Sequence, residues 1–467
     1  MTKVVFLQSM AEEWLGPMCL SSLLKARGHA CEIYVEALEE GDFIKKALES
    51  SPDVVAFSCL ASDFPWAVRM ASEIKRQRPV LVILGGTHVT LNPDESLAPP
   101  AIDVVCIGEG EYPMAELADA LSRGQDFSGI GNLWLKKNGR VVKNEIRNLV
   151  EDLDSLPFPD RKLYAKYPFF AGRGKRPVHL GRGCPYDCSF CHNSSKKRIF
   201  EGKGRYVRWR SQENILAEIQ EIEQQEYVKV IHFIDDSFGT NKDWLEELLG
   251  KLAERTKTRH IIQASMRADM VSEDLCRAFS DYGTSNLRLR IAVETGNEEF
   301  RKSVLGKDLS NQALIRAAGL FKKYKIHFMT YSILGLPGET FPMAIETLKM
   351  NMKLRPSMAI CFIFQPYPGT VLTTFALEKG YLSPERLSKL GSPEFSGQYH
   401  SRSVLTQKDI HKAENLQKVF GLVVRYPFLF YFFRVIVPYR VFSRPLFLLY
   451  RLHLRFLLSR RLQQDCY

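Results

Sequence analysis

Short apolar runs alternate with amphipathic runs along the first 128 residues. An apolar run of this length is typical of a strand that is buried on both faces of a sheet. The runs between them repeat apolar positions every three or four residues, which predicts helices that pack on that sheet. The predicted strands are residues 4–8, 31–35, 54–58, 80–84 and 104–107, and the predicted helices are residues 15–27, 43–50, 66–78 and 114–123.

This alternation predicts an α/β fold in which the N-terminal region is a doubly wound, flavodoxin-like parallel sheet. Ligands of such sheets bind at the carboxyl ends of the strands. Paired glycines there allow close backbone approach to a ligand, although they also occur in ordinary tight turns. A histidine in such a loop more often forms hydrogen bonds than binds a metal. The residues at these strand ends include Gln8, Ser9, Ser58, Gly85, Gly86, Thr87, His88, Gly108 and Gly110.

Residues 129–175 read as a connector. The Asn138-Gly139 pair predicts a β-hairpin with a type I′ turn over residues 133–142. Pro157 and Pro159 favour an extended linker after it. We therefore expect domains at residues 1–128 and 176–375, joined by this connector and followed by a helical C-terminal region at 376–467.

The central region predicts six strand–helix units, which form a partial (β/α)6 barrel. Residues of a barrel that carry chemistry lie at the carboxyl ends of its strands. The predicted strands are residues 179–180, 230–234, 261–265, 287–293, 327–334 and 358–364, and the predicted helices are residues 214–224, 242–255, 273–282, 312–324 and 343–354.

A cysteine-rich loop at residues 181–193 follows the first of these strands. Cys184, Cys188 and Cys191 have the spacing CxxxCxxC. Three thiolates on one loop can hold three irons of a [4Fe–4S] cluster and leave the fourth iron open to a small molecule. A zinc site that adds His192, a haem attached at the CxxCH string, and buried structural cysteines are the alternatives.

The later barrel strands also end in polar residues or in Gly and Pro. Each has an ordinary structural explanation, such as a helix cap, a buried ion pair or a tight turn. Their common position at one end of the barrel favours a shared binding site. They include Asp235, Asp236, Arg267, Glu294, Gly335 and Pro337.

Together these motifs resemble the radical S-adenosylmethionine (SAM) superfamily, in the branch with an N-terminal cobalamin-binding domain. The resemblance covers about residues 1–385. It rests on the cysteine loop with Phe190 and on the strings that begin at Gly85, Asp103, Glu294, Gly335 and Pro366: Gly-Gly-Thr-His-Val-Thr, Asp-Val-Val-Cys-Ile-Gly-Glu-Gly-Glu, Glu-Thr-Gly-Asn, Gly-Leu-Pro-Gly-Glu and Pro-Tyr-Pro-Gly-Thr.

The resemblance implies a role for each matching residue. The three cysteines would hold the cluster, and Phe190 would contact the adenine of SAM through its backbone. Glu294 would hold the ribose hydroxyls, while Asp235, Asp236 and Arg267 would orient the methionine amine and carboxylate. Gly335 and Pro337 would complete the SAM site, and the nine residues at the N-terminal strand ends would hold cobalamin.

It also implies an enzyme that forms a 5′-deoxyadenosyl radical and methylates an unactivated carbon through cobalamin. The partners would be a small or lipid-like substrate and an electron donor of the flavodoxin or ferredoxin type, without nucleic acid. Cyclisation, oxidation or rearrangement, or a non-catalytic Fe–S or zinc protein, are the alternatives. The chain departs from other cobalamin proteins in lacking an Asp-x-His-x-x-Gly string, and from the superfamily in having Tyr331 where a glycine is usual.

Charge is concentrated at the C-terminus. The net charge of +11 includes +7 from residues 421–467, which hold eight Arg and one acid, Asp465. The basicity is therefore weak evidence for nucleic-acid binding by the rest of the chain. Ten cysteines without a paired pattern and without a secretory leader favour a reducing cytoplasm.

The C-terminal tail also contains blocks of aromatic and aliphatic residues, beginning at Tyr426. No block reaches the ~20 residues that span a bilayer. The spacing of four arginines predicts one helix face, with Pro445 kinking or restarting the helix. The tail is thus expected to lie on an anionic membrane surface, to pack over the barrel, or both. The four arginines are Arg440, Arg444, Arg451 and Arg455.

Overall fold

The computed structural model describes residues 1–225, 227–256, 260–390 and 402–459, with side chains up to residue 452. The chain divides into two compact units. The first contains residues 1–184, 192–228 and 367–370, and the second contains residues 185–191, 229–366 and 371–467. The predicted domain boundaries at residues 128, 175 and 375 stay predictions.

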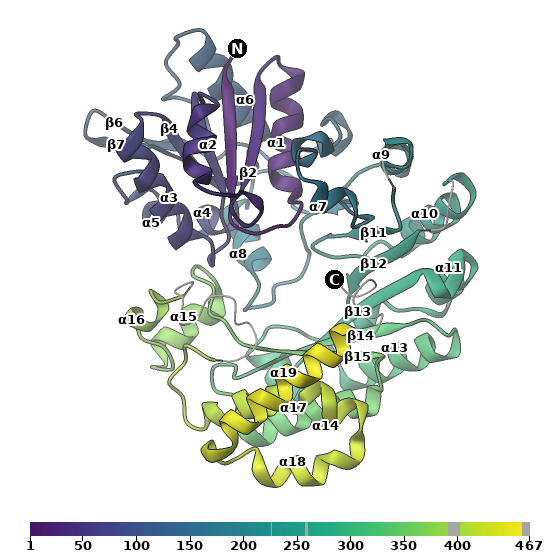
Figure 1. The fold of residues 1–467 in the computed structure, drawn as a ribbon. Helices are drawn as coiled ribbons and strands as arrows, with labels where there is room; N and C mark the ends of the chain where they lie inside the picture. Colours follow the sequence, from purple (N-terminus) through teal and green to yellow (C-terminus); the bar gives the residue numbers. More distant parts are fainter. Residues whose placement is uncertain (226, 257–259, 391–401, 460–467) are drawn as a thin grey trace. The chain divides into compact units, whose positions relative to one another are not determined.

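A seven-stranded sheet forms the centre of the first unit, in the order β2-β1-β3-β4-β5-β6-β7 (Figure 1). The first five strands are parallel, in the flavodoxin-like order that the sequence predicts. They are β1 (Lys3–Gln8), β2 (Ala30–Val35), β3 (Val54–Ser58), β4 (Leu81–Gly85) and β5 (Val104–Cys106).

The predicted hairpin forms, but it extends this sheet instead of standing in a connector. β6 (Leu133–Lys137) and β7 (Arg140–Lys143) are antiparallel, and β6 pairs with β5. Asn138 and Gly139 have φ angles of 51° and 74°, as a type I′ turn requires.

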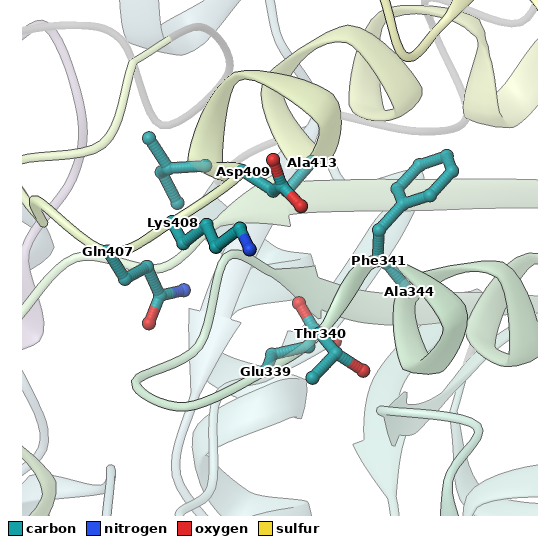
Figure 2. Close-up of a pocket in the computed structure, with 9 residues that line it drawn as sticks. Glu339, Thr340, Phe341, Ala344, Gln407, Lys408, Asp409 and Ala413 are labelled. Atoms are coloured by element: carbon teal, nitrogen blue, oxygen red, sulfur yellow. The ribbon is translucent and has the colours of Figure 1, made fainter.

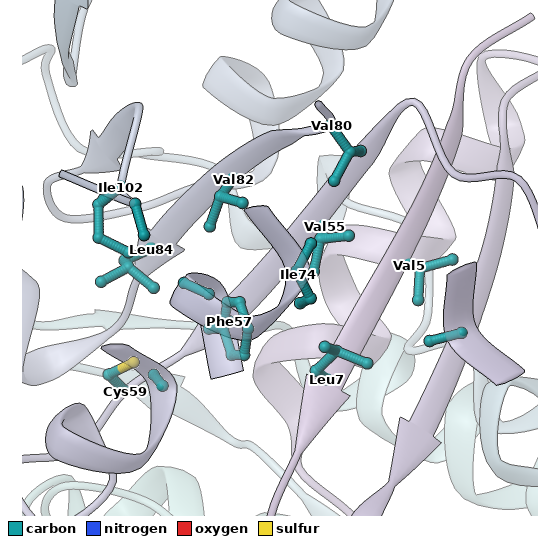
Figure 3. Close-up of a cluster of buried hydrophobic side chains, with 14 of the residues drawn as sticks. Val5, Leu7, Val55, Phe57, Cys59, Ile74, Val80, Val82, Leu84 and Ile102 are labelled. Carbon is teal, nitrogen blue, oxygen red and sulfur yellow. The ribbon is translucent and has the colours of Figure 1, made fainter. Parts of the chain in front are cut away.

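Of the six helices between residues 15 and 122, four were predicted and two short ones were not. Strand side chains such as Val55 and Phe57 pack with Ile74 of α3 in a continuous apolar core (Figure 3). Thr87 and His88, predicted to lie in a loop, belong to a short helix that follows Gly86. The helices are α1 (Leu15–Ala26), α2 (Phe43–Glu49), α3 (Phe64–Gln77), α4 (Thr87–Leu91), α5 (Pro93–Leu97) and α6 (Glu111–Ser122).

The remainder of the first unit corrects one predicted strand. The strand expected at residues 179–180 lies earlier, as β8 (Lys175–Val178). The backbone at Gly181 instead joins a two-stranded antiparallel pair, β9 (Gly181–Arg182) with β10 (Arg208–Trp209). The helices here are α7 (Pro168–Ala171), α8 (His192–Ile199) and α9 (Gln212–Gln225).

Five of the six predicted barrel strands lie in the second unit. They pair in parallel in the order β15-β14-β13-β12-β11, so a C-terminal parallel sheet is confirmed. They are β11 (Val230–Phe233), β12 (Ile261–Met266), β13 (Leu287–Glu294), β14 (Phe328–Leu334) and β15 (Met358–Ile363).

Side-chain caps explain where several helices of the second unit begin. Asn241, Ser272, Asn297 and Ser310 each accept a hydrogen bond from a backbone N–H of the first turn. The short α12 was not predicted. The helices are α10 (Lys242–Arg255), α11 (Glu273–Gly283), α12 (Glu298–Ser303), α13 (Asn311–Lys323) and α14 (Phe341–Leu354).

A helical C-terminal region follows, as predicted. α17 packs on β15 and α14, and its Phe420 shares a core cluster with Phe430 and Phe433 of α18. The tail therefore does pack on the sheet of this unit. The helices are α15 (Val371–Glu378), α16 (Pro384–Leu387), α17 (Ile410–Arg425), α18 (Phe430–Ile436) and α19 (Ser443–Ser459).

One prediction for the tail is wrong. Arg440 lies in a separate short helix (Arg440–Phe442), so it does not share a helix with Arg444 and Arg451. Pro445 stands in the first turn of α19, where a helix tolerates proline, so the helix restarts there. Across the described residues, every helix is too short or too polar to cross a bilayer. Some predicted features lie outside the described residues. They are the side chain of Arg455, the whole of Arg460 and Arg461, and most of the loop predicted at residues 391–403.

Candidate functional site

Residues 185–191 of the cysteine loop belong to the second unit and contact the segment that follows α12. The Ser189 N–H donates to the Leu305 carbonyl at 2.9 Å, and Ser189 Oγ donates to the Val304 carbonyl at 2.7 Å. The Leu372 N–H donates to the Ser189 carbonyl at 2.9 Å. Distant parts of the chain thus hold this loop in place.

The three cysteines have the donor chemistry that a [4Fe–4S] cluster needs. Cys184 is buried, whereas Cys188 and Cys191 are half-buried. The Cys191 N–H donates to the Cys188 carbonyl at 3.1 Å, which closes a tight turn between them. In the part of the chain that the structure describes, no three His, Cys, Asp or Glu side chains are arranged to hold a metal ion, so convergence of these sulfurs stays a prediction.

Glu294, the predicted ribose ligand, forms a buried ion pair. Its Oε1 lies 2.8 Å from Nζ of Lys307, and the two side chains are 9% and 4% exposed. Lys307 Nζ also donates to the Ala292 carbonyl at 2.8 Å. Glu294 ends β13 with a φ of 59°, in the left-handed region. The carboxylate is therefore held in one orientation at the strand end where SAM is predicted to bind.

Arg267, predicted to meet the methionine carboxylate, already has an acidic partner. Its guanidinium donates to both oxygens of Asp269, at 3.0 and 2.7 Å, and stacks 3.8 Å from the Tyr186 ring centre. Burial lowers the pKa of Arg267, but the hydrogen bond and charge of Asp269 outweigh this and raise it. Arg267 thus stays cationic beside the cysteine loop.

The other predicted SAM residues lie at the ends of β11 and β14. Asp235 is half-buried, and Asp236 is exposed. Gly335 has a φ of 71°, and its N–H donates to Glu339 at 2.7 Å, so the turn that contains Pro337 is closed by this carboxyl.

Phe190 is partly buried against an apolar cluster of the second unit. The Tyr331 ring packs on Phe362, with ring centres 5.7 Å apart. Their predicted relation to adenine stays a prediction.

Glu339 borders a small, open pocket with Thr340, Lys408 and Asp409 (Figure 2). Burial raises the pKa of Glu339 to about 8, against the smaller opposing effect of two backbone N–H groups. The carboxyl is therefore mostly protonated at neutral pH. We expect it to support the turn rather than to bind a cation.

At the carboxyl ends of the first sheet, Gln8 is occupied by structural hydrogen bonds. Its Nε2 donates to the carbonyls of Met10 and Glu12, and its Oε1 accepts from the Tyr164 hydroxyl at 2.7 Å. Gln8 therefore shapes the loop that carries Ser9. Ser9 in turn lies 3.5 Å from Asp63.

Gly86 is required by a close backbone approach. Its φ is 96°, and a Cβ there would lie 2.7 Å from the Cys59 nitrogen. The neighbouring Ser58 Oγ would lie 3.2 Å from that Cβ. Below it, Thr90 Oγ1 donates to the Gly86 carbonyl and accepts from the Gly108 N–H at 3.0 Å. Thr90 thus links Gly86, which follows β4, to Gly108, which follows β5.

Two buried polar side chains at this edge lack partners for some of their polar atoms within the described residues. Both ring nitrogens of His88 and Oδ2 of Asp63 are without a hydrogen bond, although the side chains are only 4% and 7% exposed. Burial lowers the pKa of His88 to about 4 and raises that of Asp63. Unpaired buried polar atoms are costly. Together with the glycine turn, they fit a bulky polar cofactor such as cobalamin at this edge.

Beyond Gly108, an acidic pair binds two arginines. Glu109 lies 2.9 Å from both Arg182 and Arg208, and Glu111 pairs with Arg182 at 2.5 Å. Although burial raises the pKa of Glu109, the two guanidinium groups lower it overall. This network fixes the turn between Gly108 and Gly110.

Sequence reasoning missed Lys307 and Asp63. The only local feature that could have pointed to Lys307 is its place after Gly306, between two amphipathic helices. Asp63 looked like an ordinary residue before a helix.

Two protein-family models match this chain, one for each kind of domain that the sequence predicts. The Radical SAM superfamily model matches residues 178–350, and the B12 binding domain model matches residues 10–118. The uncharacterized methyltransferase PH0819 of Pyrococcus horikoshii is 31% identical over 376 residues, which are 79% of each chain.

Two further relatives are more distant. The anaerobic magnesium-protoporphyrin IX monomethyl ester cyclase of Rubrivivax gelatinosus is 26% identical over 366 residues, 75% of this chain and 63% of that protein. The structure of TsrM from Kitasatospora setae, with cobalamin and a [4Fe–4S] cluster bound, has a TM-score of 0.67 at 16% identity and covers 81% of this chain and 75% of its own. That likeness shows a shared fold.

The cysteine loop, the two parallel sheets and the extent of the match to the Pyrococcus protein agree with one another. They favour a catalytic Fe–S site over the zinc, haem and structural alternatives. We conclude that the chain belongs to the radical SAM superfamily, in its branch with a B12-binding domain, and is an enzyme that uses a [4Fe–4S] cluster, SAM and cobalamin.

Proposed function

We propose that this enzyme methylates an unactivated carbon of a small, hydrophobic substrate. The observation that carries the proposal is the presence, in one chain, of a radical SAM region and a B12-binding region, together with 31% identity to a protein named as a methyltransferase. When bound, the cluster and SAM supply a carbon-centred radical, and cobalamin supplies a methyl group.

The protein's own residues would bind the cluster and SAM and orient them. We assign Cys184, Cys188 and Cys191 to the cluster, and Glu294 to the ribose, because a carboxylate accepts hydrogen bonds from hydroxyl groups. Arg267, which stays cationic, suits the methionine carboxylate.

Asp235 and Asp236 suit the methionine amine. The backbone of Phe190 suits the adenine, and the turn of Gly335 and Pro337 completes the site. Cobalamin would lie at the edge lined by Ser9, Ser58, Gly85 to His88, Gly108 and Gly110, with Gln8 supporting the first loop.

A second candidate is a radical reaction without methyl transfer, such as cyclisation, oxidation or rearrangement. The relative from Rubrivivax gelatinosus, which is named as a cyclase, favours it. In either case the reaction needs an external electron donor, for which we propose a flavodoxin or ferredoxin.

The test is anaerobic reconstitution of the full chain. Iron, sulfide and corrinoid are measured first, and then SAM and a reductant are added. We expect 5′-deoxyadenosine in the wild type and none in Cys184→Ala. Transfer of label from methyl-labelled SAM to bound corrinoid would support methylation, whereas nucleoside without labelled corrinoid would favour the second candidate. Intact iron with no nucleoside above the variant would refute both.

We also propose that the C-terminal tail contacts an anionic membrane surface, where a lipid-like substrate would be available. The C-terminal aromatic surface is a group of exposed apolar side chains between residues 426 and 452. Five exposed arginines, from Arg425 to Arg451, accompany it, and no acid occurs between Glu414 and Asp465. Aromatic and cationic side chains together suit a lipid interface. The apolar residues are Tyr426, Phe428, Tyr431, Phe432, Val435, Tyr439, Val441, Phe447, Leu448 and Leu452.

Co-sedimentation with phosphatidylglycerol vesicles tests this contact. We expect the full chain to bind, and Phe428→Ser with Phe432→Ser to bind at least tenfold more weakly. Val141→Ser, at an exposed apolar position of β7, is the matched control. Equal binding by all three proteins would contradict the proposal.

A further inference from the structure

The segment from Val304 to Asp308, which follows α12, lies against several parts of the predicted SAM site in the second unit. Its first two residues accept hydrogen bonds from Ser189 of the cysteine loop, at 2.7 and 2.9 Å. Gly306, with a φ of 60°, approaches the same loop, since a Cβ there would lie 2.9 Å from the Asp187 carbonyl oxygen.

The next residue of the segment, Lys307, contacts the end of β13. Its ammonium group donates to Glu294 Oε1 and to the Ala292 carbonyl, both at 2.8 Å. The pairing of β13 with β14 shifts register between Ala292 and Glu294, and such an irregularity re-aims a side chain. Within the described residues, Oε2 of Glu294 has no hydrogen bond, so it is available to a ligand.

Asp308 completes the segment by contacting Arg267. The Asp308 carbonyl accepts a hydrogen bond from Arg267 Nη2 at 2.9 Å. Five consecutive residues therefore contact the cysteine loop, the carboxylate assigned to the ribose and the guanidinium assigned to the methionine carboxylate.

We infer that residues 304–308 form a positioning segment for SAM, in which Lys307 orients Glu294 toward the ribose hydroxyls. This inference rests on the proposed binding role of Glu294 and adds Lys307 to that site as a positioning residue. A neutral side chain at position 307 would leave Glu294 without its ionic partner and free to turn away from the ribose. An arginine there would keep the charge.

The experiment measures SAM binding to the cluster-reconstituted full chain, together with binding of 2′-deoxy-SAM. The variants are Lys307→Met, Lys307→Arg and Glu294→Gln. Lys322→Met is the matched control, because Lys322 is an exposed lysine of the same unit. Iron content and the EPR spectrum of the reduced cluster report whether the cysteine loop is intact.

We expect Lys307→Met to weaken SAM binding at least tenfold with unchanged iron content, and Lys307→Arg to restore most of the affinity. The preference for SAM over 2′-deoxy-SAM should shrink in Lys307→Met as it does in Glu294→Gln. A merely structural role would weaken both ligands equally, so an unchanged preference would overturn the inference.

If Lys307→Met does not fold, the preference for SAM over 2′-deoxy-SAM is measured in Lys307→Arg. A preference as small as that of Glu294→Gln would then also overturn the inference. Failure of the wild type to bind SAM would instead refute the proposed function.

Discussion

The substitution Gly306→Ala tests whether the positioning segment sets the shape of the cysteine loop. Gly306 has a φ of 60°, and an added Cβ would lie 2.9 Å from the backbone oxygen of Asp187. That oxygen belongs to the residue before Cys188, so the loop must shift to relieve the contact.

Gly306→Ala lowers the free energy of unfolding for two reasons, and their effects add. The left-handed conformation costs an L-residue about 1–2 kcal/mol. Overpacking against a backbone that cannot rotate away adds roughly 1–3 kcal/mol. Gly380 separates the two costs, because its φ is 72° and nothing lies within 4 Å of its added Cβ. Gly380→Ala should therefore show only the conformational cost.

Urea unfolding followed by circular dichroism gives the free energy of unfolding of each variant, and colorimetric analysis gives iron bound per chain after reconstitution. We expect Gly306→Ala to lose about 1–3 kcal/mol more than Gly380→Ala and to bind less iron. Equal losses with equal iron content would show that the segment does not control the loop.

Two further predictions concern pH. Burial lowers the pKa of His88 to about 4, so below pH 6.5 the unfolded chain takes up a proton that the native chain does not. Between pH 7 and pH 5 the unfolding free energy of the wild type should therefore fall by about 2 kcal/mol relative to that of His88→Phe, as measured by urea unfolding of both proteins at each pH. Burial raises the pKa of Glu339 to about 8, so between pH 4.5 and 8 the native chain holds a proton that the unfolded chain releases, and the stability of the wild type relative to Glu339→Gln falls as pH rises. Urea unfolding of both proteins measures this difference, and the same pH dependence in both would contradict the assignment.

The local pattern of residues was enough to predict most strands and helices. Apolar runs and helical periodicity depend on near neighbours, so β1, β3 and α1 lie within a residue of their predicted bounds. The Asn138-Gly139 turn was predicted for the same reason, because two positive φ angles in sequence are a local requirement. The weak signal at residues 179–180 failed, since neighbouring backbone pairing decides where so short a strand lies.

The cysteine spacing and the strand-end motifs were also enough to predict the family, because few residue types can ligate an Fe–S cluster. The tertiary structure decided which partners these residues meet. The pairing of Glu294 with Lys307 and the engagement of Arg267 by Asp269 depend on burial. So does the lack of a hydrogen-bond partner, among the described residues, for the two ring nitrogens of His88. Burial raises the cost of an unpaired charge or polar atom, and it arises from contacts between residues far apart in sequence, which no local pattern contains.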